Sequence, residues 1–238
     1  MSRCLLELRG LTAGYGAQYV VKDIDLAVHQ GATTAIIGPN GHGKSTILRA
    51  ISGLLVNRTG SIKLDGTDLT AMRPDQVVAA GVVHIPQGDL VFPEMSVLDN
   101  LLMGAYLPEA AASAHERLEE VYALLPRLKE RAHQWASTLS GGERRMLAIG
   151  RGLMTGGRIL MVDEPSLGLA PIVIEQIYEI LEELRAAGRT IVLVEENPAR
   201  AMEIADDIHL LDDGSFVWSG TPRSLEGNPD VLETYVGT

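Results

Sequence analysis

Cysteine is nearly absent from this 238-residue sequence, since Cys4 is the only one, which excludes an internal disulfide and any cysteine-built metal site. The sequence also lacks a run of the roughly 20 apolar residues that a membrane-spanning helix needs. Residues 1–7 become charged too soon for a signal peptide, so we expect a cytosolic protein unless a partner holds it at a membrane. Positive charge is scarce, with 20 Lys and Arg against 31 Asp and Glu, and the formal net charge of −11 disfavours nucleic acid as a partner.

The remaining composition is that of a globular α/β chain, with 46% hydrophobic and 21% charged residues. Alternating strand and helix patterns predict a mostly parallel sheet with helices on both faces. Expected strands cover residues 5–9, 20–28, 33–37, 61–64, 81–86, 158–164, 190–194, 208–211 and 215–219, with a loop at 10–16. Expected helices cover 45–51, 74–80, 96–103, 113–125, 143–154, 171–187 and 198–205, with two short helices between 221 and 235.

Strand patterns are almost missing between residues 89 and 157, where apolar residues recur at helical spacing. The length of the chain suits one large domain with an inserted lobe better than two independent domains. We therefore expect a single domain over residues 1–238, in which a sheet-bearing core (1–88 and 158–238) carries a helical lobe (89–157).

One glycine-rich stretch reads G-x-x-x-x-G-K-S, the phosphate-binding P-loop, and it follows an expected strand and opens an expected helix. Glycines let such a loop wrap closely around an anion, while its N–H groups and the helix start face the phosphates. We expect Lys44 to reach the β- and γ-phosphates and Ser45 to ligate Mg²⁺. The alternative is a glycine-rich turn that binds nothing. The predicted nucleotide-binding residues here are Gly38, Pro39, Asn40, Gly41, His42, Gly43, Lys44, Ser45 and Thr46.

A second apolar strand ends in two acids, Asp163 and Glu164, in the form of a Walker B strand. Ligands of α/β sheets lie beyond the carboxyl ends of the strands, so these acids and the P-loop are expected to face one site. Asp163 is expected to hold Mg²⁺ through its water shell, and Glu164 to act as general base toward the attacking water. The alternative is that both acids simply end a strand.

Residues 139–145 read Leu-Ser-Gly-Gly-Glu-Arg-Arg at the start of an expected helix, with Ser140 as a possible N-cap. Apart from capping, free N–H groups at such a start can bind a phosphate. The stretch resembles the LSGGQ signature of ATP-binding cassette (ABC) ATPases. The order P-loop, glutamine after a strand, signature and Walker B strand resembles that family over essentially the whole chain. The resemblance implies an ATPase with a P-loop NTPase core, a mostly parallel sheet, an N-terminal antiparallel β portion and an inserted helical lobe.

Members of this family act as head-to-tail dimers, in which the signature of one cassette covers the ATP held by the other. The resemblance therefore implies a second cassette, identical or related, and gives Ser140, Gly141, Gly142 and Glu143 a place at its ATP. It matches Tyr15 to the aromatic that stacks on adenine and residues 166–170 to the D-loop. It matches Gln87 to the glutamine that touches the metal and water, so that Ser45, Gln87 and Asp163 would hold Mg²⁺. Taken singly, Tyr15 would be a loop aromatic and Gln87 a surface polar residue.

More narrowly, residues 88–93, 164–171 and 227–237 resemble the ATPases of branched-chain amino acid importers. This implies two transmembrane permease subunits, an extracytoplasmic substrate-binding protein, and a place on the cytoplasmic face of the cell membrane. Importers of urea or short-chain amides use similar ATPases, so they remain an alternative. ABC ATPases of DNA repair or ribosomes usually carry long coiled coils or two cassettes in one chain, and a P-loop kinase would lack the signature.

Glu196 departs from the family pattern. ABC ATPases usually place a histidine there, after the strand at 190–194, where it contacts the γ-phosphate; this importer subgroup often has glutamine. An ionised glutamate would repel that phosphate, so Glu196 is protonated, turns away, or leaves the role to Asn197. We keep Glu196 with Glu164 and Gln87 as a catalytic candidate, and expect slower hydrolysis than a histidine would give.

Overall fold

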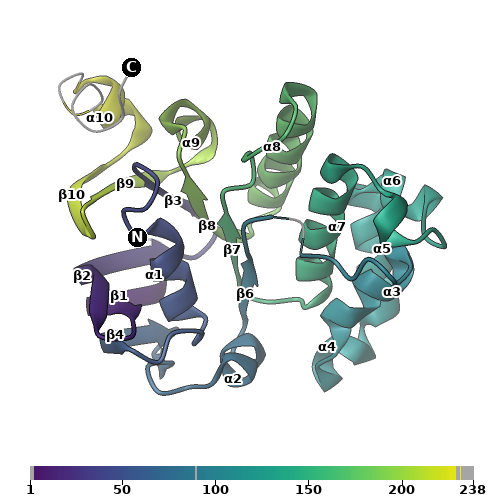
Figure 1. Cartoon of the computed structure of the whole chain (residues 1–238), viewed down its shortest axis with the longest axis horizontal. Coiled ribbons are helices and arrows are strands. Elements are labelled where there is room, and N and C mark those ends of the chain that lie inside the picture. The colour runs from purple at the N-terminus through teal and green to yellow at the C-terminus, as the bar shows by residue number, and fades with distance from the viewer. Residues whose placement is uncertain (1–2, 89, 229–230, 232–238) are drawn as a thin grey trace.

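The larger sheet carries the P-loop strand in its middle. The structure, a computed structural model, describes residues 3–88, 90–228 and 231. The order of the six strands is β10-β9-β3-β8-β7-β6, in which β10 is antiparallel to β9 and the others are parallel (Figure 1). Their bounds are β3 (Thr33–Ile37), β6 (Val82–Ile85), β7 (Ile159–Asp163), β8 (Thr190–Glu195), β9 (Asp207–Asp212) and β10 (Ser215–Gly220). Every residue of β3, β7 and β8 is buried, as helix-covered parallel strands require.

Successive side chains of these strands enter two separate cores, because a strand points its residues alternately to its two faces. Leu160 and Val162 pack with α8 (Pro171–Ala186), α9 (Pro198–Ile204) and the helical lobe. Ile159 and Met161 pack with α1 (Lys44–Ile51), α2 (Pro74–Ala79) and the second sheet. The predicted α/β architecture with helices on both faces is confirmed.

The second sheet is antiparallel and has the order β2-β1-β4-β5. Its strands are β1 (Cys4–Tyr15), β2 (Gln18–His29), β4 (Arg58–Leu64) and β5 (Thr67–Asp68). The loop expected at residues 10–16 is wrong, because β1 continues to Tyr15 through several register shifts in its pairing with β2. These bulges keep Leu11 and Ala13 buried, although they interrupt the alternation that marks a strand in the sequence.

Helices replace strands between β6 and β7. They are α3 (Val97–Leu102), α4 (Pro108–Ala112), α5 (Ala114–Leu124), α6 (Pro126–Glu130) and α7 (Gly141–Met154), with 3-10 turns at Met103–Ala105 and Ala136–Thr138. This group lies to one side of the sheet, away from α1 and the antiparallel strands (Figure 1). Apart from one isolated bridge between Ser96 and Trp135, the described residues 90–157 contain no β-structure.

The C-terminal region adds α10 (Pro222–Glu226) after β10. The second short helix expected toward residue 235 lies outside the described residues, as does much of the 227–237 resemblance. Within the described part of the chain, every helix is too short or too polar to cross a membrane.

Candidate nucleotide-binding site

The P-loop joins β3 to α1 in a tight curl that only glycine permits at two points. Gly38 has φ 149°, and a Cβ there would come within 2.1 Å of the Leu211 carbonyl oxygen. Gly43 has φ 108°, and a Cβ there would meet a Val21 methyl at 2.5 Å. Close approach without side chains leaves the backbone N–H groups of the loop free to surround an anion.

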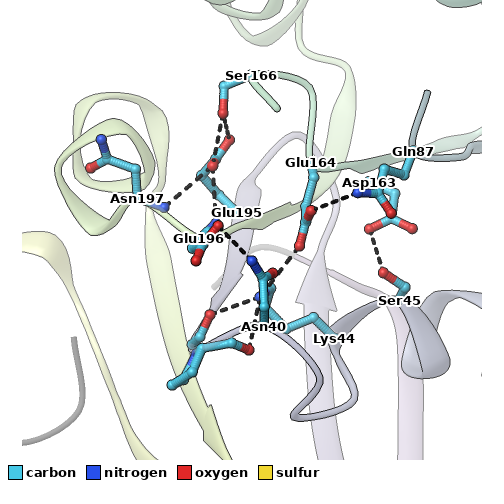
Figure 2. Close-up of polar contacts among 12 residues, drawn as sticks. Asn40, Lys44, Ser45, Gln87, Asp163, Glu164, Ser166, Glu195, Glu196 and Asn197 are labelled. Atoms are coloured by element: carbon cyan, nitrogen blue, oxygen red, sulfur yellow. Dashed lines mark hydrogen bonds and ion pairs between the residues drawn. The ribbon is translucent and has the colours of Figure 1, made fainter. Parts of the chain in front are cut away.

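Lys44 lies inside this curl. Its Nζ donates to the carbonyl oxygens of Gly38 (2.7 Å) and Pro39 (3.1 Å), and the side chain is almost fully buried. The same Nζ lies 3.4 Å from Glu164 Oε1 (Figure 2). A buried ammonium held beside the loop is well placed to meet an incoming phosphate.

Glu164 follows β7 and contacts two of the predicted site residues at once. Besides Lys44, its Oε2 accepts a hydrogen bond from Gln87 Nε2 at 3.1 Å (Figure 2). Burial raises the pKa of Glu164, while the charge of Lys44 acts in the opposite direction. A carboxylate with a raised pKa is a stronger proton acceptor than an ordinary glutamate, which suits a general base.

Asp163 and Ser45 form the part of the site that fits a divalent cation. Ser45 Oγ donates to Asp163 Oδ1 at 2.9 Å, and the carboxylate is almost fully buried. Burial raises the pKa of Asp163, and the Ser45 hydrogen bond partly offsets this. Asp163 Oδ2 has no hydrogen-bond partner among the described residues. A buried carboxylate oxygen without a donor, beside a hydroxyl, is the donor set that Mg²⁺ takes together with substrate phosphates and water.

Across the described residues, His, Cys, Asp and Glu form no group of three that could hold a metal by themselves. Gln87, which we placed among the metal ligands, is exposed and bonds to Glu164 rather than to Asp163.

The predicted signature residues begin α7 as a capping box. Ser140 Oγ accepts from the Glu143 N–H (3.3 Å), and both the N–H and the hydroxyl of Ser140 donate to Glu143 Oε2 (2.9 Å each). Arg131 Nε lies 2.9 Å from the other oxygen of Glu143. Burial acts to raise the pKa of Glu143, but the Ser140 hydrogen bonds and the Arg131 charge lower it on balance. Glu143 thus fixes the helix start, and Ser140 remains exposed at the surface.

The remaining candidates surround the P-loop. Tyr15 is 46% exposed at the end of β1, and its hydroxyl accepts from Arg49 on α1 at 2.9 Å. His42 Nδ1 lies 2.8 Å from Asp212 Oδ1 beside the end of β9, whereas Gly41 is exposed and Thr46 is buried in α1.

Glu196 is exposed beside the P-loop, where its Oε2 accepts from Asn40 Nδ2 at 2.9 Å (Figure 2). Asn197, the residue considered as its substitute, instead caps α9 by accepting from the N–H groups of Ala199 and Arg200.

Arg145 is a site residue that sequence reasoning missed. It is buried, and its guanidinium donates to the carbonyl oxygens of Pro86 (2.8 Å), Gly88 (2.6 Å) and Asp163 (2.7 Å). It therefore ties α7 both to the segment that carries Gln87 and to the end of β7. A signal was present, since Arg145 falls among apolar residues on the inner side of the expected helix, where a charge needs a specific partner.

Comparison with known proteins gives consistent matches. The sequence profile described as "ABC transporter" matches residues 21–167. The high-affinity branched-chain amino acid transport ATP-binding protein BraG of Pseudomonas aeruginosa is 39% identical over 98% of this chain and 100% of its own length. The probable branched-chain amino acid transport ATP-binding protein LivF of Archaeoglobus fulgidus is 37% identical over 90% of this chain and 91% of its own.

The fold also resembles that of solved ATP-binding cassettes. MJ1267, an ATP-binding cassette of an ABC transporter in its ADP conformation, has a TM-score of 0.86 at 27% identity and covers all of both chains. A nucleotide-free ATP-binding cassette from an ABC transporter has a TM-score of 0.85 at 26% identity, over 97% of this chain and 98% of its own. The resemblance therefore extends over the P-loop core and the helical lobe together.

Proposed function

The chain belongs to the ABC transporter family, and from this premise we propose that it is the ATPase subunit of an amino-acid importer and acts in a head-to-tail dimer. Nucleotide binding and ATP hydrolysis follow from the family itself. The substrate class is the one named for BraG and LivF, branched-chain amino acids. The observation that carries the proposal is the cluster of Lys44, Gln87 and Glu164 beside Ser45 and Asp163, at the carboxyl ends of β3, β6 and β7.

We assign nucleotide binding to the core, residues 1–88 and 158–238. The P-loop N–H groups and Lys44 would bind the β- and γ-phosphates, and the exposed ring of Tyr15 would stack on adenine. Ser45 and Asp163 would hold Mg²⁺, with Gln87 added when nucleotide is bound. The cation supplies charge that stabilises the phosphate oxygens during transfer.

Hydrolysis needs a water molecule on the γ-phosphorus, and Glu164 and Gln87 are placed to prepare it. Gln87 would orient the water and Glu164 would take its proton while the water oxygen bonds to phosphorus. The bond from phosphorus to the leaving ADP oxygen breaks in the same displacement. Lys44 stabilises the charge that remains on the phosphates.

The second half of the site would come from the helical lobe, residues 89–157, of a partner cassette. Ser140 is exposed at the start of a 14-residue helix whose first N–H groups can donate to a phosphate. Gly141 and Gly142 present that backbone without side chains, and Glu143 keeps the cap in place. Two ATP molecules would close the dimer, and their hydrolysis would reopen it.

A hollow of about 340 Å³ beside the Gln87 segment suits the permease subunits. Its lining includes four exposed apolar side chains, those of Leu90, Phe92, Met103 and Tyr106. An exposed apolar patch of this kind marks an interaction surface. We assign it to a cytoplasmic segment of one permease subunit. The chain would thus lie on the cytoplasmic face of the membrane, with a substrate-binding protein on the other side.

The ATPase rate measured against protein concentration tests this proposal, with Glu164→Gln as the control. A steeper-than-linear rise that the control abolishes is expected for a site shared between two copies. Failure of the wild-type chain to bind ATP would overturn the proposal. Uptake of leucine, and not of urea, by vesicles carrying the chain with its permeases and binding protein would support the substrate class.

A further inference from the structure

Glu195 is a buried acid to which the reaction described above gives no role. It is the last residue of β8, and only 2% of it is exposed. Its carboxylate accepts from four uncharged groups: Ser166 Oγ (3.0 Å to each oxygen), the Tyr178 hydroxyl (2.7 Å), and the N–H groups of Glu196 (2.9 Å) and Asn197 (3.3 Å). In Figure 2, dashed lines join Glu195 to Ser166 and to Asn197. A buried carboxylate is stable only when donors surround it in this way.

These donors belong to three separate parts of the fold. Ser166 begins the segment 166–170, two residues after Glu164, and Tyr178 lies on α8. Glu196 donates its N–H to Glu195, and its side chain accepts a hydrogen bond from Asn40 of the P-loop. A chain of hydrogen bonds therefore runs from residues 166–170 through Glu195 and Glu196 to the P-loop.

This chain of hydrogen bonds lies beside the reacting groups, and for that reason it bears on hydrolysis. A hollow of about 360 Å³ is lined by Glu164, by residues 166–169 and by residues 195–197. Burial, and then the Glu195 charge, raises the pKa of Tyr178, so its hydroxyl stays protonated and keeps donating. Fully satisfied buried networks hold their members in one arrangement.

We propose that Glu195 is a positioning residue for ATP hydrolysis: it holds residues 166–170 and Glu196 in register with the P-loop without touching the nucleotide. This rests on the proposed hydrolysis of ATP at the P-loop. A displacement of residues 166–170, the segment matched to the D-loop, would then reach Asn40 through Glu195 and Glu196. Breaking the link would slow hydrolysis and leave ATP binding intact.

Ser166→Ala is the most direct variant, because Ser166 is only half-buried and its hydroxyl can be removed without opening the core. We expect a fall in kcat of about threefold to thirtyfold, the range found for residues that carry coupling, with the Kd for ATP unchanged. Ser61→Ala, at a half-buried serine of β4, is the matched control and should leave both values unchanged.

Glu195→Gln and Glu195→Ala separate positioning from simple packing. The amide keeps an acceptor for Ser166 and for the Glu196 N–H, so Glu195→Gln should retain more of kcat than Glu195→Ala. Adding Ser166→Ala to Glu195→Ala should cost nothing further, because the link is already broken. Wild-type kcat in both Ser166→Ala and Glu195→Gln, or losses that multiply in the double variant, would overturn the proposal.

Hydrogen exchange on the full chain provides a readout that does not need hydrolysis. Glu195→Ala should speed exchange at residues 166–170 and 196–197 and leave residues 44–51 of α1 protected. Unchanged exchange at 166–170 would overturn the positioning role even if the wild-type chain hydrolysed ATP. Conversely, a wild-type chain that failed to bind ATP would contradict the proposed function, whereas the exchange pattern would still decide what Glu195 holds in place.

Discussion

The P-loop and the start of α7 both present glycine-flanked helix N-termini, but they lie in different surroundings. Lys44, Asp163 and Glu164 are buried and bonded across segments far apart in the sequence. Ser140 is exposed, and its side chain hydrogen-bonds with Glu143, three residues away. The P-loop half is therefore built by the whole fold, while the signature half is a local structure set at the surface. Such a division suits a site of which each chain completes only part.

Arg145 joins the two halves, so its removal should have the largest effect. Arg145→Ala leaves the carbonyl oxygens of Pro86, Gly88 and Asp163 without their buried donor. We expect the free energy of unfolding to fall by about 3 kcal/mol, measured by urea denaturation. Arg127→Ala removes an exposed pair with Glu130 and should leave the free energy of unfolding nearly unchanged. Equal losses in the two variants would show that α7 is not anchored through Arg145.

Lys44→Ala should impair the P-loop half of the site and leave the signature half unchanged. Removal of the ammonium deprives the phosphates of a charge-assisted partner, and we expect ATP affinity of the isolated chain to fall about fiftyfold. Fluorescence titration with a labelled ATP analogue at low protein concentration gives the measurement. Ser140→Ala, titrated in parallel, should bind as the wild type does. A weaker Ser140→Ala monomer would contradict the division between the halves.

Ser140→Ala should affect the exposed half in two ways. Loss of the N-cap should lower stability by about 1 kcal/mol, and steady-state ATPase should fall because the proposed dimer would place this helix start on the partner's ATP. Ser96 caps α3 by accepting from the Asp99 N–H, so Ser96→Ala is a control with a similar stability loss and an intact ATPase. If both variants lost activity equally, capping alone would explain the result.

Asp163→Asn should make the nucleotide-free protein more stable at neutral pH. Because burial raises the pKa of Asp163, its contribution to stability is fully present below the ordinary pKa of an aspartate and is lost as pH rises through the raised value. The amide avoids that loss, so we expect a gain in the free energy of unfolding at pH 7 that disappears in acid, measured by urea denaturation. Asp75 is an exposed acid whose pKa is lowered by the Arg73 hydrogen bond. Asp75→Asn should therefore lower stability at neutral pH, and this loss should disappear in acid. A less stable Asp163→Asn at pH 7 would refute the expectation.

Glu196→His should give the smallest change, because the side chain is exposed and screened. Replacing a carboxylate near the γ-phosphate by a donor should speed hydrolysis about twofold to fivefold. The rate at saturating ATP is the measurement, with Glu196→Gln as the uncharged comparison. An equal or lower rate in Glu196→His would contradict the idea that the glutamate slows the reaction.

Local patterns predicted much of the fold. The helices expected at 171–187 and 96–103 are present as α8 and α3, and α8 buries Ile177, Ile180, Leu181 and Leu184. The sequence failed at residues 10–16, because bulged pairing of β1 with β2 and β4 depends on neighbours far along the chain. The roles assigned to the site residues stay predictions, although the expected approach of the P-loop to the end of β7 is present in the structure.

The sequence by itself determined which chemical groups follow which strands: a lysine and serine after β3, two acids at the end of β7, and a serine cap before α7. Motif spacing carries that information because each motif is local. Only the tertiary structure decided the partner of each buried charge. Asp163 and Ser45 are 118 residues apart, and Glu195 and Ser166 are 29 apart. Such bonds form where packed strands and helices bring donors together, so no local pattern could assign Arg145 to three carbonyls or Glu195 to four donors.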